Sequence, residues 1–147
     1  TSFTVAHSLT LLLAARDVIR LPTAVTESLI AASIVYVAAE NYFIVDAGHR
    51  WVLTFAFGLV HGLGFSSMLR DRLVDTDSIT LPVVSFNLGV ELGQLAILLV
   101  VFPLIATMRR APDHVQRRIL RIGSAPILLL GLAWLADRVF QLGFMPF

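Results

Sequence analysis

Cysteine and lysine are both absent from the 147-residue chain, and charged residues make up only 14% of it. Without cysteine the chain can form no disulfide, no thiolate-bound zinc or iron–sulfur site and no cysteine nucleophile, so any metal must be bound by nitrogen and oxygen ligands. All basic side chains are arginines and the net charge is +1. This charge pattern gives no broad basic surface for nucleic acid.

Hydrophobic residues make up 57% of the chain and the mean hydropathy is +0.84, whereas an ordinary soluble domain has about 25% charged residues. Alternating segments of about ten residues, the pattern of a transmembrane β-barrel, are not seen. We therefore predict an all-α, polytopic transmembrane helical bundle of about five membrane helices in one domain, residues 1–147. The predicted segments are residues 1–16, 22–44, 51–69, 80–108 and 122–142.

The first apolar run, residues 3–15, is shorter than the roughly 20 residues that cross a bilayer. It does not resemble a signal peptide, because no basic region precedes it and His7 interrupts its apolar core. The chain begins at Thr1 rather than at a methionine. We expect the first membrane helix to be truncated and further sequence to precede it.

The loops between the segments predict the orientation of the bundle. One side carries six arginines and the other four, which favours a cytoplasmic 109–121 loop and a C-terminus outside. Within that loop, "HVQRRILR" is interpreted either as a short interfacial helix with its arginines toward lipid headgroups or as a plain positive-inside loop. Pro22 and Pro82 are placed to open their helices, and Pro103 predicts a kink or an end within the fourth segment.

Three polar residues interrupt the fourth segment in "FNLGVELGQ". At 100° per residue, Glu91 lies about 40° and Gln94 about −20° from Asn87, so the three side chains share one stripe and one neighbouring helix. Intramembrane polar groups of this kind either bind a substrate or hold helices together. A carboxylate such as Glu91 indicates the first of these by default.

Glycine pairs with a spacing of four accompany this stripe, at Gly89 and Gly93, and also accompany His61, at Gly58 and Gly62. Such pairs allow helices to approach closely. We therefore predict that His61 faces the Asn87–Glu91 stripe in the interior of the bundle.

The other segments add further polar groups. His7 lies in the first segment, and Glu27 and Asn41 share a face of the second but are about 21 Å apart along its axis. Glu40 is predicted to lie near a membrane surface. Asp137 and Arg138 are predicted to pair or to extend toward the interface. Imidazole, carboxylate and amide groups without sulfur suit a divalent ion such as nickel, zinc or cobalt.

Four blocks in the order "TSFTVAHSLTL", "ESLIAASIVYVAAEN", "FGLVHGLGFSS" and "FNLGVELGQL" give the chain a specific resemblance. It resembles the HupE/UreJ family of hydrogenase and urease accessory membrane proteins. The resemblance implies a multi-pass protein of the bacterial inner membrane that supplies nickel to metalloenzymes, usually described as a permease, with maturation proteins as further partners. That family has an additional N-terminal helix with a His and Asp-His pattern, which this chain lacks.

The residues that match the family motifs are His7, Glu27, Asn41, His61, Asn87 and Glu91. We predict His7, His61 and Glu91 as direct metal ligands. Asn87 and Gln94 are predicted as secondary oxygen donors, and Glu27 and Asn41 as groups at which the ion enters or leaves.

Three functions are compatible with these residues. The first is a nickel-type permease, which is not an enzyme. The second is an intramembrane metal-dependent hydrolase, in which His7 and His61 hold zinc and Glu91 activates water, and the third is a structural module whose polar residues only fix helix packing.

Overall fold

The computed structural model describes residues 2–43, 50–65 and 80–145, and within these ranges all regular structure is α-helical. The helices are α1 (Ser2–Ala15), α2 (Thr23–Phe43), α3 (Arg50–Gly64), α5 (Thr80–Met108) and α6 (Asp113–Phe140). The prediction of an all-α fold is confirmed. Residues 66–69 of the third predicted segment, and two of the arginines compared between the two sides, Arg70 and Arg72, lie outside the described residues.

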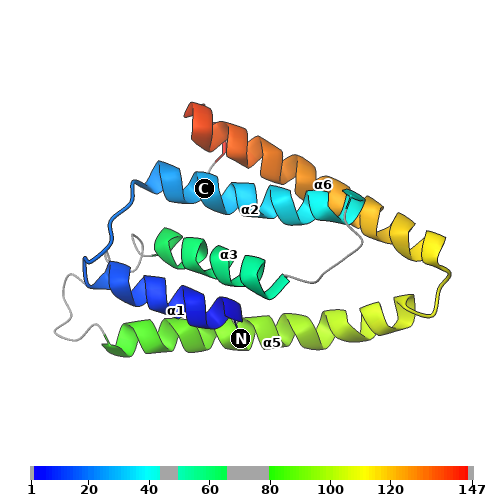
Figure 1. The fold of residues 1–147 in the computed structure, drawn as a ribbon, viewed down its shortest axis with the longest axis horizontal. Coiled ribbons are helices and arrows are strands. Elements are labelled where there is room, and N and C mark those ends of the chain that lie inside the picture. The colour runs from blue at the N-terminus through cyan, green and yellow to red at the C-terminus, as the bar shows by residue number, and fades with distance from the viewer. Residues whose placement is uncertain (1, 44–49, 66–79, 146–147) are drawn as a thin grey trace.

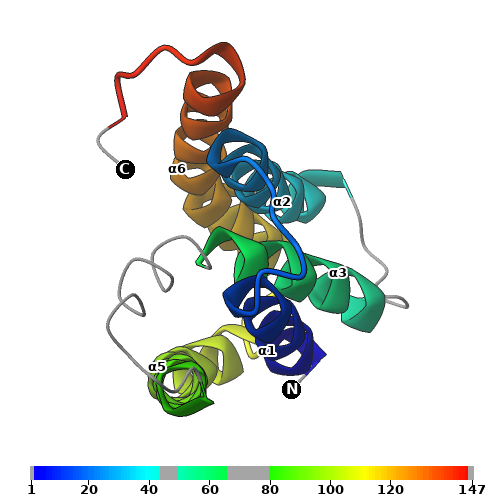
Figure 2. The ribbon, with the colours of Figure 1, turned by 90° about the vertical axis from the view of Figure 1, so that its left-hand side faces the viewer.

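The helices form a row in which α3 lies between α1 and α2 (Figure 1). α5 packs on the outer side of α1, and α6 packs on the outer side of α2. Figure 2 shows the same order from a perpendicular direction. Successive helices run in opposite directions (Figure 1). The end of α2, the start of α3, the end of α5 and the start of α6 therefore lie toward one end of the bundle.

Three of the helices are long and apolar enough to cross a membrane: α2, α5 from Leu81 onward, and α6. α1 has 14 residues and α3 has 15. At 1.5 Å per residue these two helices are about 21–22 Å long, which is shorter than the roughly 30 Å hydrocarbon core. Within the residues that the structure describes, the prediction of about five membrane helices is therefore met by five helices, of which three have a full spanning length.

Proline residues mark two helix starts as predicted. The Pro22 carbonyl accepts hydrogen bonds from the Val25 and Thr26 N–H groups at 3.0 and 3.2 Å, immediately before α2. Pro82 lies in the first turn of α5, where a missing N–H group leaves no helix bond unmade. The fixed φ angle of proline suits both positions.

Two expectations about the later helices are corrected. α5 does not end at Pro103 but continues to Met108 with the proline inside it, because a helix is the structure that satisfies backbone groups in lipid. The alternative expectation, a kink at Pro103, stays a prediction. "HVQRRILR" is not a separate interfacial helix: it forms the first turns of α6, which begins at Asp113 rather than near residue 122. The Pro112 carbonyl accepts the first bonds of this helix, from Val115 and Gln116, and no glycine or proline interrupts residues 113–121.

The two glycine pairs have different environments. A Cβ atom on Gly58 would lie 2.9 Å from Ala6 Cβ, and one on Gly62 would collide with the Thr10 hydroxyl and the His7 carbonyl. The α3 pair therefore allows close contact with α1. A Cβ atom on Gly89 or Gly93 would meet nothing within 4 Å. The expectation that these pairs bring α3 and α5 together is wrong.

Candidate functional site

His7 lies on the buried face of α1 and is 1% exposed. Its Nδ1 atom is 3.2 Å from Asn87 Oδ1 on α5. The Asn87 amide nitrogen donates to the Val83 carbonyl at 2.9 Å, so the amide oxygen is the atom turned toward His7. Because that oxygen can only accept, His7 Nδ1 carries the proton and the lone pair of the neutral ring is on Nε2. This is the tautomer in which an imidazole binds a metal through Nε2.

Aromatic rings surround the His7 imidazole. Phe3 and Phe86 stack on it with ring centroids 5.8 and 6.0 Å away, and Phe65 meets it edge-on at 6.0 Å. These rings come from α1, α5 and the residue after α3. These three rings make much of the surroundings of the imidazole apolar, and a low-polarity environment strengthens electrostatic interactions made there.

His61 of α3 also contacts the Phe3 ring, which meets it edge-on at 5.4 Å. Its Nδ1 atom is 2.8 Å from the Phe57 carbonyl oxygen of its own helix. A carbonyl can only accept, so His61 also has its Nε2 lone pair available. Phe3 thus packs against both imidazoles.

The stripe of Asn87, Glu91 and Gln94 faces α1. Asn87 and Glu91 line a groove of about 480 Å³ together with Thr4 and Ser8 of α1. The Thr4 hydroxyl donates to Gln94 Oε1 at 3.5 Å. The prediction that the stripe shares one neighbouring helix is confirmed.

The predicted partner of the stripe is wrong, because His7 rather than His61 lies against it. The physical reason is that α1 packs into the glycine face of α3 and takes the place beside α5. The sequence did contain a signal for α1: Thr4 and Ser8 are one turn apart and flank His7.

Glu27 and Asn41 lie near opposite ends of α2 and both face α6, in agreement with their shared face. Glu27 Oε2 is 3.0 Å from Arg138 Nε, and Asn41 Nδ2 donates to Ser124 Oγ at 2.7 Å. Both side chains therefore connect α2 to α6, away from His7.

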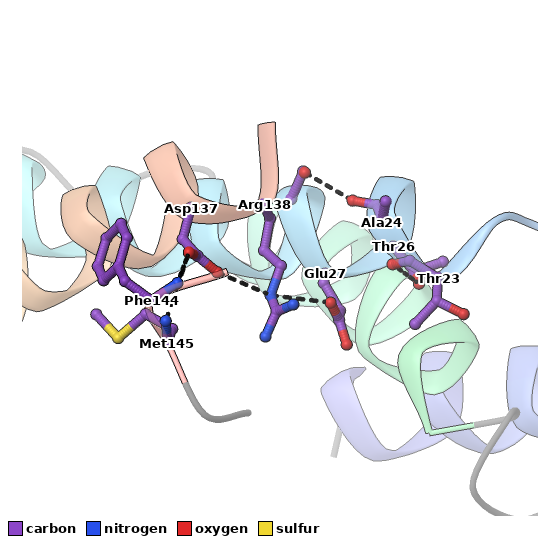
Figure 3. A network of polar contacts seen from close by, with 9 residues as sticks. Thr23, Ala24, Thr26, Glu27, Asp137, Arg138, Phe144 and Met145 are labelled. Carbon is purple, nitrogen blue, oxygen red and sulfur yellow. Dashed lines mark hydrogen bonds and ion pairs between the residues drawn. The ribbon is translucent and has the colours of Figure 1, made fainter. Parts of the chain in front are cut away.

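Asp137 has a role that the sequence did not reveal. It is 1% exposed, and its Oδ1 atom accepts hydrogen bonds from the Phe144 and Met145 N–H groups at 2.8 and 3.4 Å (Figure 3). Arg138 Nε lies 3.8 Å from Asp137 Oδ2 and continues the network to Glu27. Asp137 thus holds the segment after α6 against the helix end. The sequence feature that could have indicated this role is the adjacent acid and base, Asp137 and Arg138, at the end of an apolar segment.

Glu40 Oε1 lies 3.8 Å from Arg50 Nε, where α2 ends and α3 begins. A cavity of about 410 Å³ is lined by this pair and also by His61. Arg50 and His61 are about 16 Å apart along α3 at 1.5 Å per residue. Glu40 therefore lies at the end of this cavity where α2 ends, away from the level of His61. Its predicted position near a membrane surface stays a prediction.

Within the described ranges, no three His, Asp or Glu side chains lie close enough together to hold a metal ion. The arrangement instead offers His7 paired with Asn87, Glu91 one turn further along α5, and His61 in contact with the same Phe3 ring as His7. The metal-binding roles of His7, His61, Glu91, Asn87, Glu27 and Asn41 stay predictions.

A family model described as HupE / UreJ protein matches residues 1–138. Neither a curated protein nor a solved structure matches the chain. Because the match covers most of the sequence, the chain belongs to the HupE/UreJ family, whose members are accessory proteins for metal handling in hydrogenase and urease systems.

Proposed function

We propose, from the chain's membership of the HupE/UreJ family, that it is a bacterial inner-membrane permease for a divalent transition metal ion, nickel, that serves hydrogenase or urease maturation. The observation that carries the proposal is His7, a buried imidazole whose Nδ1 is held by Asn87 while Glu91 follows one turn later on α5. Zinc and cobalt ions accept the same ligand types.

In the proposed site, His7 Nε2 provides a neutral nitrogen ligand and Glu91 provides negative charge. Glu91 lies in the groove between α1 and α5 and forms no hydrogen bond or ion pair with the residues that the structure describes. A carboxylate inside a membrane is costly, and a passing cation would offset that cost. A small, mixed set of ligands also suits transport, which requires release as well as binding.

His61 is assigned to a second step of the same path. Phe3 contacts both imidazoles, so movement of this ring would let an ion bound at His7 reach His61. The hydrolase alternative requires His7 and His61 to hold one zinc ion together. We assign the two imidazoles, which both contact Phe3, to successive binding steps rather than to one shared ion.

Glu27 and Asn41 are better explained as groups that fix helix packing. Each contacts α6 directly, through Arg138 and Ser124 respectively. Hydrogen bonds of this kind between membrane helices contribute about 1 kcal/mol. The permease proposal therefore rests on His7, Asn87, Glu91 and His61.

The test is uptake of radioactive nickel by the full-length protein in proteoliposomes. His7→Asn keeps a donor near the position of Nδ1 but removes the Nε2 lone pair, and Glu91→Gln keeps the shape but removes the charge. Both variants should fold normally and lose at least about tenfold in uptake, the scale of one lost metal interaction.

Asn41→Ala is the matched control. It removes the hydrogen bond to Ser124, so it should lower stability by about 1 kcal/mol while the folded protein transports normally. Normal nickel uptake by both His7→Asn and Glu91→Gln would refute the permease site and favour a purely structural role for these groups.

A further inference from the structure

The first two turns of α6 carry four basic side chains on one face. His114, Arg117, Arg118 and Arg121 follow the spacing i, i+3, i+4, i+7, which places them within an arc of about 100° on an α-helix. Together with Ile122 they line a surface hollow of about 550 Å³. All four side chains are exposed. The sequence predicted arginines directed toward lipid headgroups here, but on a separate short helix or a loop rather than on the first turns of α6.

The three guanidinium groups of this basic face form no ion pair with any residue that the structure describes. Asp113, the acidic residue of the first turn, does not pair with them either. By contrast, Arg20, Arg50 and Arg138 each contact a carboxylate. The hollow therefore combines concentrated positive charge with free hydrogen-bond donors, which favours an anionic ligand.

The position of the face indicates where such a ligand would come from. Immediately after Arg121, residues 122–136 contain no charged side chain, and α6 as a whole is long and apolar enough to cross a membrane. The first turns of α6 extend past the end of α2 (Figure 1). The basic face thus lies where an apolar span leaves the hydrocarbon region, which is the level of lipid headgroups.

We propose that His114, Arg117, Arg118 and Arg121 form a binding site for the phosphate group of an anionic phospholipid. The planar guanidinium groups bind phosphate oxygens through paired N–H donors. Ile122, exposed beside them, contacts the start of the acyl chains. Basic clusters next to a membrane span attract anionic lipids, and here the helical spacing gathers the charge into one hollow.

The experiment titrates the detergent-purified protein with fluorescently labelled phosphatidylglycerol, and compares it with phosphatidylcholine of the same acyl chains. Detergent removes any effect of membrane orientation. The double variant Arg117→Gln/Arg121→Gln should bind phosphatidylglycerol roughly 30-fold more weakly, which corresponds to about 1 kcal/mol for each arginine. Binding of phosphatidylcholine should be weak and unchanged.

Arg109→Gln/Arg110→Gln is the matched control, because it removes the same charge from the connection that precedes α6 without touching the hollow. It should weaken binding by less than about threefold, the effect of more distant charge alone. Arg117→Lys/Arg121→Lys keeps the charge but loses the planar donors, so it should fall between the wild type and the Gln double variant.

Three results would overturn the proposal. The first is equal weakening by the two Gln double variants, which would indicate diffuse charge attraction. The second is displacement of the labelled lipid by inorganic phosphate at concentrations similar to those of the lipid, which would indicate a site for the free ion. The third is equally effective displacement by a poly-glutamate peptide, which would indicate a protein-binding surface. None of these measurements depends on nickel transport.

Discussion

The two faces of α1 differ in how they contact their neighbours. Toward α3, Ala6 and Thr10 meet the bare backbone at Gly58 and Gly62, with no space for a side chain on either glycine. Toward α5, the same helix borders open grooves. These grooves are lined by Thr4 and Ser8 on α1 and by Glu91 on α5. α1 is thus closely packed along α3, whereas toward α5 it packs where Leu11 and Ala15 meet Val83 and leaves grooves beside this cluster.

A glycine pair or a polar stripe shows that a helix surface permits close packing or polar contact. Whether that contact forms depends on which helix packs against the surface. Gly89 and Gly93 have the same spacing as the α3 pair, yet nothing approaches them. Asn41 and Asn87 are both amides in apolar helices, yet one binds a serine hydroxyl and the other an imidazole.

The largest expected effect comes from filling the closed face. In Gly62→Ala the new methyl group would collide with the Thr10 hydroxyl and the His7 carbonyl, so we expect a loss of about 1–3 kcal/mol of unfolding free energy. The measurement is thermal unfolding of the detergent-purified protein. Gly93→Ala is its control and should not destabilise, because alanine is favoured over glycine within a helix by about 1 kcal/mol. Equal destabilisation by both would mean that the two faces do not differ as described.

A smaller effect is expected from the hydrogen bond that crosses the open face. Asn87→Leu leaves His7 Nδ1 without its acceptor, so stability should fall by about 1 kcal/mol. If His7 binds nickel as proposed, nickel affinity should also fall by about tenfold, because the imidazole loses its orienting partner. Isothermal titration gives the affinity, and a double-mutant cycle with His7→Leu isolates the pair. Additive losses in that cycle would show that the two side chains do not interact.

The smallest effect is expected at the edge of the same face. Thr4→Val removes an exposed hydroxyl whose hydrogen bond to Gln94 Oε1 is long, at 3.5 Å. The unfolding free energy should therefore change by no more than about 0.5 kcal/mol. Thermal unfolding beside the Asn87 variant gives the comparison. A loss as large as that of Asn87→Leu would mean that the groove is closed in the membrane.

Much of the fold was predictable because hydrophobicity sets helix positions. The bounds of α2 and α5 are within about one residue of the predicted segments, as expected where long apolar runs end at charged loops. The shared face of Glu27 and Asn41, and that of Asn87, Glu91 and Gln94, followed from helical geometry alone. The prediction failed at the start of α6, because arginines were interpreted as a loop although they also favour helix formation.

The neighbours within the site could not be predicted in the same way. His7 and His61 both lie within apolar segments, and the two glycine pairs have the same spacing. Which helices meet depends on side-chain fit between surfaces distant in sequence, such as Ala6 and Thr10 against Gly58 and Gly62. Periodicity gives the direction of a side chain from its own helix axis but does not identify the helix that it will face.

The one-sided support of α5 has a mechanical consequence. Every residue from Glu91 to Thr107 is exposed, and α1 is the main neighbour of this helix. Lipid contacts change little when such a helix shifts, whereas separating α1 from α3 would break their interlocked packing. If the chain is the permease proposed above, α5 is the element expected to rock against the α1–α3 unit, because alternating access moves one part of a transporter around a stationary site.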